Sequence, residues 1–429
     1  MSCIDEPPWC VCVLVLPLVW GQMMHPFTHV LHKLKLSSFG KGVIVAGRFP
    51  ASFGHADREI LGVEEMKKRS LWSLAAATAG LGLVLGLSHP LLLRAQSAPK
   101  FEVDPYWPKP LPNGWVTGEV GGTCVDKQDH VFTLNRLNLS PKEEQISHPA
   151  PPVIEFDPDG NMVNSWGDPK LVPGRIHGCF VDGDNNIWIG GEHDAIVQKY
   201  SHDGSKLLLQ IGQKGVYDTS DGTYEGAAMN SSHTLLNRPA AMAVDPANGD
   251  VYIADGYGNR RVVVFDKDGK YLRQWGKQGT TADGEAGVPG LFVQWVHSVI
   301  LGNDGLVYVC DRRGDRVQVF DKMGNFQKNI YIVKGTGKKG PQVDGSAWWV
   351  DFSPDPGQKY MYVADGGNEA VRILDHSSGE ILASFGQAGH QAGEFTYLHT
   401  LSVDSKGNII AGETIGGRRV QKFKLVSGQ

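Results

Sequence analysis

The sequence is poor in cysteine. Only six of the 429 residues are cysteine, and three of these lie within the first twelve positions, which leaves Cys124, Cys179 and Cys310 for the rest of the chain. Because three is an odd number, these residues do not make a complete disulfide framework. All three lie in apolar runs typical of strands, where a free cysteine usually acts as a small buried hydrophobic residue. We therefore expect three buried thiols without chemistry.

The sequence also lacks an excess of basic charge. Its formal net charge is −5, and no long block of one sign interrupts it. This excludes a generic basic nucleic-acid binder, so we expect no nucleic-acid partner. The 54 glycines and 24 prolines stay below the ~25–30 % that indicates disorder. With 41 % hydrophobic residues, the composition predicts a globular, turn-rich protein.

A segment typical of export signals covers residues 66–98. It starts with Met66-Lys67-Lys68-Arg69, continues with a long apolar run and ends on small residues. A signal normally stands at the start of a chain, so we expect translation to begin at Met66 and residues 1–65 to be an upstream extension that is not native. The alternative is a genuine extension with an internal anchor that tethers the protein to a membrane. Either way, residues 99–429 are expected outside the cytoplasm, in the periplasm or secreted.

A pattern recurs six times from Gly118 onward, at intervals of roughly 40 to 55 residues. Each copy holds short runs of Val, Ile, Tyr, Phe and Leu that alternate with polar residues and are separated by turns such as Asp-Gly. The clearest copies cover 177–212, 240–276 and 297–330. Four short antiparallel strands per copy predict a six-bladed all-β propeller over 99–429. The last copy has room for three strands, so Phe101-Glu102-Val103 is expected to supply its fourth and to close the ring.

Function is expected where equivalent positions of the repeats differ. The relevant position lies five residues before the aspartate, or its equivalent, that closes the first strand. From the first repeat to the sixth it holds Gly121, His177, Ala240, His297, Trp348 and His399. Alternate blades of a sixfold ring are related by about 120°, so the three histidines converge on the axis. Three neutral imidazoles and an open fourth position are the ligands of a catalytic zinc ion. Iron or copper use the same ligands, and the alternative is three histidines satisfied by backbone carbonyls.

Charged and phenolic residues follow the second strands of three repeats. Arg136 and Arg312 stand in opposite blades, so both are predicted to bind the carboxylate of an anionic substrate near the metal, unless they pair with neighbouring acids instead. Tyr257 is a candidate base or hydrogen-bond donor if the metal and the arginines lower its pKa. Asp255 and Asp311 are expected to hold the turns.

A long polar insertion separates the second and third repeats, over residues 213–235. Loops of this length often serve as binding loops or lids. His233 lies within it and is expected to be exposed to solvent. His193 and His202 have no counterparts in other repeats and are expected at the surface.

The repeats over 118–429 resemble NHL repeats, and the residues singled out resemble the peptidyl-α-hydroxyglycine α-amidating lyase family. The matching segments are Arg175-Ile176-His177-Gly178, Val296-His297-Ser298, Leu398-His399-Thr400, Ala254-Asp255-Gly256-Tyr257 and Cys310-Asp311-Arg312. The resemblance implies zinc on His177, His297 and His399, surrounded by Arg136, Tyr257 and Arg312. It also implies a lyase that cleaves the N–C bond of an α-hydroxyglycine into an amide and glyoxylate.

Two features depart from that family. Gly258 and Val319 stand where the family has cysteines of two disulfides, and Thr400 stands where it has an aspartate that binds structural calcium. Calcium is therefore not expected, and the substrate is a small anionic or peptide-like compound. The alternatives are an NHL propeller that only binds a partner, and a calcium-dependent propeller lactonase, which needs carboxylates and Asn at the axis. We expect a monomer.

Overall fold

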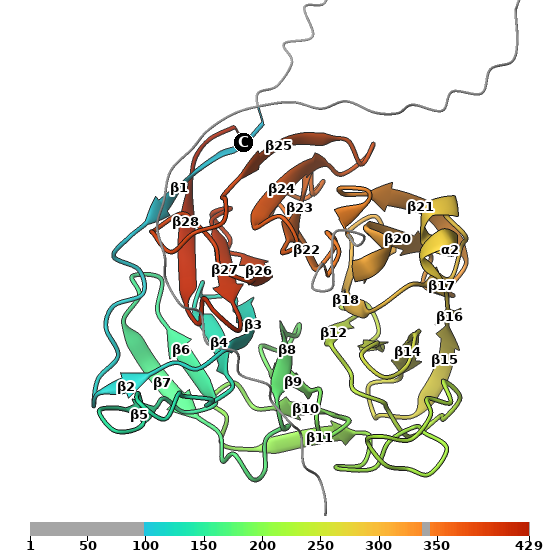
Figure 1. Ribbon diagram of the computed structural model, residues 1–429, viewed down its shortest axis with the longest axis horizontal. Helices are drawn as coiled ribbons and strands as arrows, with labels where there is room; N and C mark the ends of the chain where they lie inside the picture. Colours follow the sequence, from blue (N-terminus) through green and yellow to red (C-terminus); the bar gives the residue numbers. More distant parts are fainter. Residues whose placement is uncertain (1–97, 337–343, 429) are drawn as a thin grey trace, which may run out of the picture. The chain divides into compact units, whose positions relative to one another are not determined.

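The computed structural model describes residues 98–336 and 344–428 (Figure 1). The chain divides into the units Met1–Leu91 and Leu92–Gln429, and all described residues belong to the second. The predicted extension 1–65 and export signal 66–98 thus lie outside the described residues, apart from Ala98. Within the described ranges, no helix has the length and apolar character needed to cross a membrane.

Six four-stranded antiparallel sheets follow one another around a ring, which confirms the six-bladed propeller (Figure 1). Every blade starts with the strand nearest the axis and runs outward. The first three blades are β3 (Val120–Val125), β4 (Val131–Asn135), β6 (Val153–Phe156) and β7 (Met162–Trp166); β8 (Ile176–Val181), β9 (Ile187–Gly191), β10 (Ile196–Tyr200) and β11 (Leu207–Ile211); and β12 (Ala241–Val244), β13 (Val251–Asp255), β14 (Arg261–Phe265) and β15 (Tyr271–Trp275). The next two are β18 (Val296–Leu301), β19 (Val307–Asp311), β20 (Arg316–Phe320) and β21 (Phe326–Tyr331); and β22 (Trp349–Phe352), β23 (Tyr360–Asp365), β24 (Ala370–Asp375) and β25 (Ile381–Phe385).

The sixth blade is closed by the amino-terminal strand, as the sequence predicts. It consists of β26 (Leu398–Val403), β27 (Ile409–Glu413), β28 (Val420–Ser427) and β1 (Lys100–Asp104). Strand β1 pairs antiparallel with β28, with Val103 opposite Phe423. This sheet joins the two ends of the repeat array and so closes the ring.

Short elements lie in the connections. They are the parallel pair β2 (Trp115–Val116) and β5 (His148–Pro149), the parallel pair β16 (Lys277–Gln278) and β17 (Leu291–Phe292), the helix α2 (Thr281–Ala286) and the 3-10 turn Arg312–Gly314. Helix α2 starts with a capping box in which the Thr280 and Asp283 side chains each bond the other's backbone N–H.

The hydrophobic core lies between neighbouring blades. Alternate residues of a strand point to opposite faces of its sheet, so each blade offers one apolar face to each neighbour. Phe132 and Ile189 pack together between the first and second blades, and Tyr308 and Phe352 between the fourth and fifth. No blade covers its own faces, so the inner strands are held in place by the whole ring.

The inner strands of four blades, including the three that carry histidine, contain β-bulges. Val296 lies opposite Asp311 and Ser298 opposite Cys310, so His297 is an extra residue in β18. The register shifts in the same way at His399 in β26 and across His177 and Gly178 in β8. A bulge turns its extra residue out of the pleated alternation. It therefore lets these imidazoles point away from the packed faces of the blades.

The prediction of three unpaired thiols is wrong for two of them. Cys124 in β3 and Cys179 in β8 form a disulfide between the first two blades, with Cα atoms 5.4 Å apart. Cys310 is free and buried as expected, and burial raises the pKa of its thiol to about 12. An odd number of cysteines argued against a full framework, but only the packing of the two inner strands brings one pair within bonding distance.

Reduction of this bridge is expected to destabilise the propeller. The cysteines are 55 residues apart, so Cys124→Ser should lower the free energy of unfolding by about 2–5 kcal/mol because the unfolded chain regains freedom. Urea unfolding with and without dithiothreitol measures this. Cys310→Ala is the matched control and should keep the response to reductant. An unchanged midpoint of the wild-type protein in reductant would contradict the prediction.

Candidate metal centre

Three histidines from alternate blades meet at the propeller axis. A nitrogen of His177, one of His297 and one of His399 all lie within 4.8 Å of one another. The ring centroids are 4.6 to 5.0 Å apart. The residues are at most 2 % exposed. The structure thus brings together the three residues that the repeat alignment singles out, while their role as ligands stays a prediction.

Backbone carbonyls fix the orientation of two of the imidazoles. Nδ1 of His177 lies 2.7 Å from the carbonyl oxygen of Ala240, and Nδ1 of His297 lies 2.7 Å from that of Trp348. A carbonyl only accepts, so each Nδ1 carries the proton and each neutral ring keeps a lone pair on Nε2. Metal-binding histidines are commonly held in this way. The Nδ1 of His399 is buried and finds no hydrogen-bond partner among the described residues.

The hydroxyl of Tyr257 lies between two of these lone pairs. It is 3.0 Å from Nε2 of His177 and 2.9 Å from Nε2 of His297, and Arg312 Nη1 donates to it at 3.4 Å. A phenol has one proton, so it satisfies one Nε2 and leaves the other facing an oxygen lone pair. The cluster therefore has more acceptors than protons, and this donor set fits a bound cation such as zinc.

The imidazoles are neutral at the axis. Burial lowers the pKa of His177, His297 and His399 well below the usual range, and Arg136 acts in the same direction on all three. Burial raises the pKa of Tyr257, whereas Arg312 and Arg136 lower it. The sequence analysis expected the arginines to lower the pKa of this phenol. They do act in that direction, but among the protein's own groups burial outweighs them.

Arg312 is held between two indole rings beside the histidines. Its guanidinium carbon lies 3.3 Å from the ring centroid of Trp348 and 4.6 Å from that of Trp295. Its Nη2 pairs with Asp344 at 2.9 Å. This arginine is therefore fixed in position and is 5 % exposed.

Arg136 is fixed in a similar way from the first blade. Its Nη1 pairs with Glu119 at 2.7 Å, and its Nε donates to the carbonyl oxygen of Ile176 at 3.0 Å. Its side chain is 4 % exposed. Both predicted substrate arginines thus have acid partners within the protein, but they are buried near the histidines and are not surface ion pairs.

Sequence analysis missed a chain of charges next to Arg136. Arg175 pairs with Glu192 at 2.9 Å and with Glu119 at 3.5 Å, and Arg238 pairs with Glu192 at 2.7 Å. The guanidinium of Arg238 also lies over the ring of Tyr224 from the insertion. Glu119, Arg175 and Arg238 each stand two residues before an axial position, so the same repeat alignment contains the signal that finds them.

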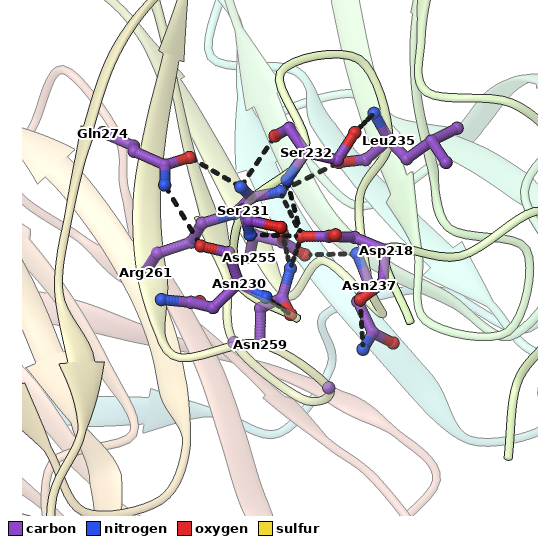
Figure 2. A network of polar contacts seen from close by, with 12 residues as sticks. Asp218, Asn230, Ser231, Ser232, Leu235, Asn237, Asp255, Asn259, Arg261 and Gln274 are labelled. Atoms are coloured by element: carbon purple, nitrogen blue, oxygen red, sulfur yellow. Dashed lines mark hydrogen bonds and ion pairs between the residues drawn. The ribbon is translucent and has the colours of Figure 1, made fainter. Parts of the chain in front are cut away.

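A buried polar network holds the turn that carries Tyr257 (Figure 2). The Asp255 carboxylate accepts from the backbone N–H of Asn237 at 2.7 Å and from Arg261 Nε at 2.9 Å. Asp218, in the insertion, accepts from the backbone N–H groups of Ser231 and Ser232 and pairs with Arg261 at 3.3 Å. Asp255 therefore holds its turn, as predicted, and the insertion is fastened behind it.

Asp311 has the same role in the fourth blade. It accepts from the backbone N–H of Val293 at 2.8 Å and pairs with Arg316 at 2.9 Å. Both aspartates are fully buried. Both bind a backbone N–H and an arginine of their own blade, so their role is structural and they take no part in the chemistry proposed for the axis.

The remaining histidines of the prediction lie away from the axial cluster. His193 is exposed, and His233 is exposed and stacks on Tyr271 at 3.8 Å, as expected for surface residues. His202 is only partly exposed, because its Nε2 lies 2.8 Å from Asp126. Thr400, which stands where the related family has a calcium-binding aspartate, is buried, and in the part of the chain that the structure describes its hydroxyl has no hydrogen-bond partner.

The inner strands of the blades also line a cavity of about 120 Å³, which was not predicted from the sequence. The Cys124–Cys179 bridge and Asp351 line it. Asp351 accepts from the backbone N–H groups of Phe352 at 2.8 Å and Val403 at 3.0 Å. Burial nevertheless raises the pKa of Asp351 to about 7.

Asp351 should make the stability of the protein depend on pH. Its carboxyl stays protonated up to about pH 7 when folded but ionises near pH 4 when unfolded, so its contribution to the free energy of unfolding is lost as pH rises between these values. The full loss is at most about 4 kcal/mol. Urea unfolding from pH 5 to 8 should show a smaller pH dependence in Asp351→Asn than in the wild type. Parallel profiles of the two proteins would contradict this assignment.

The chain is similar in sequence to several known proteins. Residues 236–265 match the NHL repeat family. The chain is 29 % identical over 336 residues to NHL repeat-containing protein 3 of Mus musculus, covering 76 % of this chain and 84 % of that protein. It is 23 % identical over 345 residues to peptidyl-alpha-hydroxyglycine alpha-amidating lyase 1 of Drosophila melanogaster, covering 74 % of this chain and 58 % of that protein. It is 24 % identical over 348 residues to peptidyl-glycine alpha-amidating monooxygenase of Mus musculus, covering 73 % of this chain and 31 % of that protein.

A solved structure of a streptogramin B lyase aligns over 76 % of this chain and 98 % of its own, with a TM-score of 0.48 and 12 % identity. The chain spans 58 % of the fly lyase and about a third of the mouse monooxygenase. It is a six-bladed β-propeller with one segment that matches the NHL repeat, and it is similar in sequence to the peptidyl-α-hydroxyglycine α-amidating lyases.

Proposed function

We propose that the protein is a zinc-dependent carbon–nitrogen lyase. Its substrate is an N-acyl-α-hydroxyglycine, which it cleaves into an amide and glyoxylate. The observation that carries the proposal is the Tyr257 hydroxyl, which lies within 3.0 Å of two inward-facing Nε2 atoms. Relatives named as amidating lyases support the reaction class. Iron is the alternative metal, because it accepts the same ligands.

The metal ligands are His177, His297 and His399. Zinc held there would supply a Lewis acid that lowers the pKa of the substrate hydroxyl by several units. The carbonyls of Ala240 and Trp348 keep Nε2 of the first two histidines aimed at the axis. Burial of all three rings keeps them neutral, as ligands must be.

The mouth of the site favours an anionic substrate. Five guanidinium groups share three carboxylates there, namely Arg136, Arg175, Arg238, Arg312 and Arg313 with Glu119, Glu192 and Asp344. The excess of positive charge attracts a carboxylate. Arg136 and Arg312 bind the substrate carboxylate and orient the carbon that bears the hydroxyl.

The reaction moves one proton and breaks one bond. The substrate hydroxyl loses its proton, a carbonyl forms at that carbon, the N–C bond breaks, and the leaving nitrogen gains a proton. Tyr257 carries the proton between the two atoms. Arg312 donates to the phenol oxygen and so favours the phenolate, against the effect of burial.

The test is an assay of products and metal together. Protein purified without a histidine tag is incubated with N-benzoyl-α-hydroxyglycine, and glyoxylate and benzamide are measured beside metal content by plasma mass spectrometry. Equimolar products that disappear with chelator and return with zinc support the proposal. Protein reconstituted with zinc that releases no glyoxylate contradicts it and favours an NHL propeller that only binds a partner. A calcium-dependent lactonase needs axial carboxylates, whereas the group at this axis consists of histidines.

The protein is further proposed to act outside the cytoplasm, in the periplasm or secreted. The Cys124–Cys179 bridge supports this, because disulfides persist in oxidising compartments.

A further inference from the structure

The turn that follows the inner strand contains a buried aspartate in several blades. Asp182, Asp245 and Asp404 are the examples in the second, third and sixth blades, and each accepts backbone N–H groups of its own turn. A lysine neutralises each of them. Lys199 lies 2.8 Å from Asp182, Lys422 lies 3.2 Å from Asp404, and Lys322 lies 2.6 Å from Asp245.

These lysines come from two positions of the fold. Lys199 and Lys422 stand in the third strand of the same blade, opposite the second residue of its neighbour strand. Lys322 stands two residues after the third strand of the following blade. A lysine of the same blade or of the next one thus neutralises each of these three buried turn carboxylates.

The first blade breaks this pattern at both positions. Its turn aspartate is Asp126, and Glu155 stands where Lys199 and Lys422 stand in their blades. His202 follows the third strand of the second blade, where Lys322 follows that of the fourth. A second histidine, His130, ends the turn of Asp126. Two carboxylates and two imidazoles therefore replace a lysine–aspartate pair.

The four side chains form two close pairs. His130 Nδ1 lies 2.6 Å from a carboxylate oxygen of Glu155, and His202 Nε2 lies 2.8 Å from one of Asp126. The ligand atoms of Asp126, His130 and Glu155 all lie within 4.8 Å of one another. The carboxylate side chains are 0 % and 6 % exposed, whereas those of His130 and His202 are 28 % and 35 % exposed.

The two carboxylates of this cluster have no lysine or arginine partner within the described residues. Their ion-pair partners there are the two histidines. Two neighbouring buried carboxylates are costly unless a cation lies close to them. A divalent ion supplies that charge, and two imidazoles with two carboxylates are a donor set suited to zinc.

We propose that Asp126, His130, Glu155 and His202 form a second divalent-metal site of the zinc class, between the first and second blades. It lies at the opposite end of β3 from Gly121, so it is separate from the three axial histidines. The imidazoles lie on the solvent side of the carboxylates, which gives an ion a way in. The site does not depend on the proposed lyase activity.

The test restores the lysine that other blades have. Glu155→Lys recreates the pairing of Lys199 with Asp182, so the variant should fold and should bind one zinc fewer per chain than the wild type after equilibrium dialysis. His202→Lys recreates the pairing of Lys322 with Asp245 and should lose the same equivalent. Urea unfolding of each variant checks that the propeller is intact, and the second variant serves if the first fails to fold.

A spectroscopic measurement makes the outcome independent of the axial site. Zinc added to metal-free His297→Ala protein should shift the imidazole NMR signals of His130 and His202, and this shift should be absent from the same protein with Glu155→Lys. The proposal is overturned if both lysine variants bind as much zinc as the wild type. It is also overturned if His130 and His202 are both protonated at pH 7.5 in metal-free protein and zinc leaves their signals unchanged.

Discussion

His297→Ala should lose one metal ion per chain and lower the turnover of N-benzoyl-α-hydroxyglycine to background. The imidazole supplies one of three inward-facing nitrogens and holds Tyr257 through its Nε2 at 2.9 Å. Two remaining histidines give a catalytic metal fewer than the three protein ligands it usually has. Metal content by plasma mass spectrometry and glyoxylate release are measured on the same preparation.

The matched control is His233→Ala. His233 is exposed and stacks on Tyr271, which is not one of the residues around the axial histidines. Its loss should change neither metal content nor turnover. Circular dichroism should show that both variants keep their β-sheet. If metal-depleted His297→Ala protein still released glyoxylate at the wild-type rate, the proposed mechanism would be wrong.

Tyr257→Phe should keep the metal but lower kcat by about 10²–10⁴-fold, the usual contribution of a positioned acid–base group. The substitution removes only the hydroxyl that contacts His177, His297 and Arg312. The ring can keep its packing against Trp295, so the site should retain its shape. The KM should change less than kcat, because the substrate carboxylate is bound by the arginines.

Tyr224→Phe is the control for this second prediction. Tyr224 lies under Arg238 at the same mouth, and among the described residues its ring contacts are with His193 and Tyr217 and not with the axial histidines, so its hydroxyl should matter little to kcat. Steady-state kinetics with both variants measure kcat and KM separately. A Tyr257→Phe enzyme with wild-type kcat would remove Tyr257 from the proton transfer and leave only its packing role.

Much of the fold follows from local sequence patterns. Alternating apolar residues and Asp-Gly turns recur six times, and a blade that cannot cover its own faces requires neighbours. The fourth strand of the last blade was also predictable, because only three strands remained for it and β1 fills the gap. The axial histidines were predictable because equivalent positions of the repeats lie at equal distances from the axis of the ring.

The sequence by itself therefore determined the number of blades, the closure of the ring and the three residues that meet at its axis, because each depends on repetition along the chain. Only the tertiary structure decided the bridge between Cys124 and Cys179, the acid partners of Arg136 and Arg312, and the position of the Tyr257 hydroxyl between two imidazoles. These depend on the distances between side chains of different blades and on burial that shifts their pKa. No single repeat specifies these quantities.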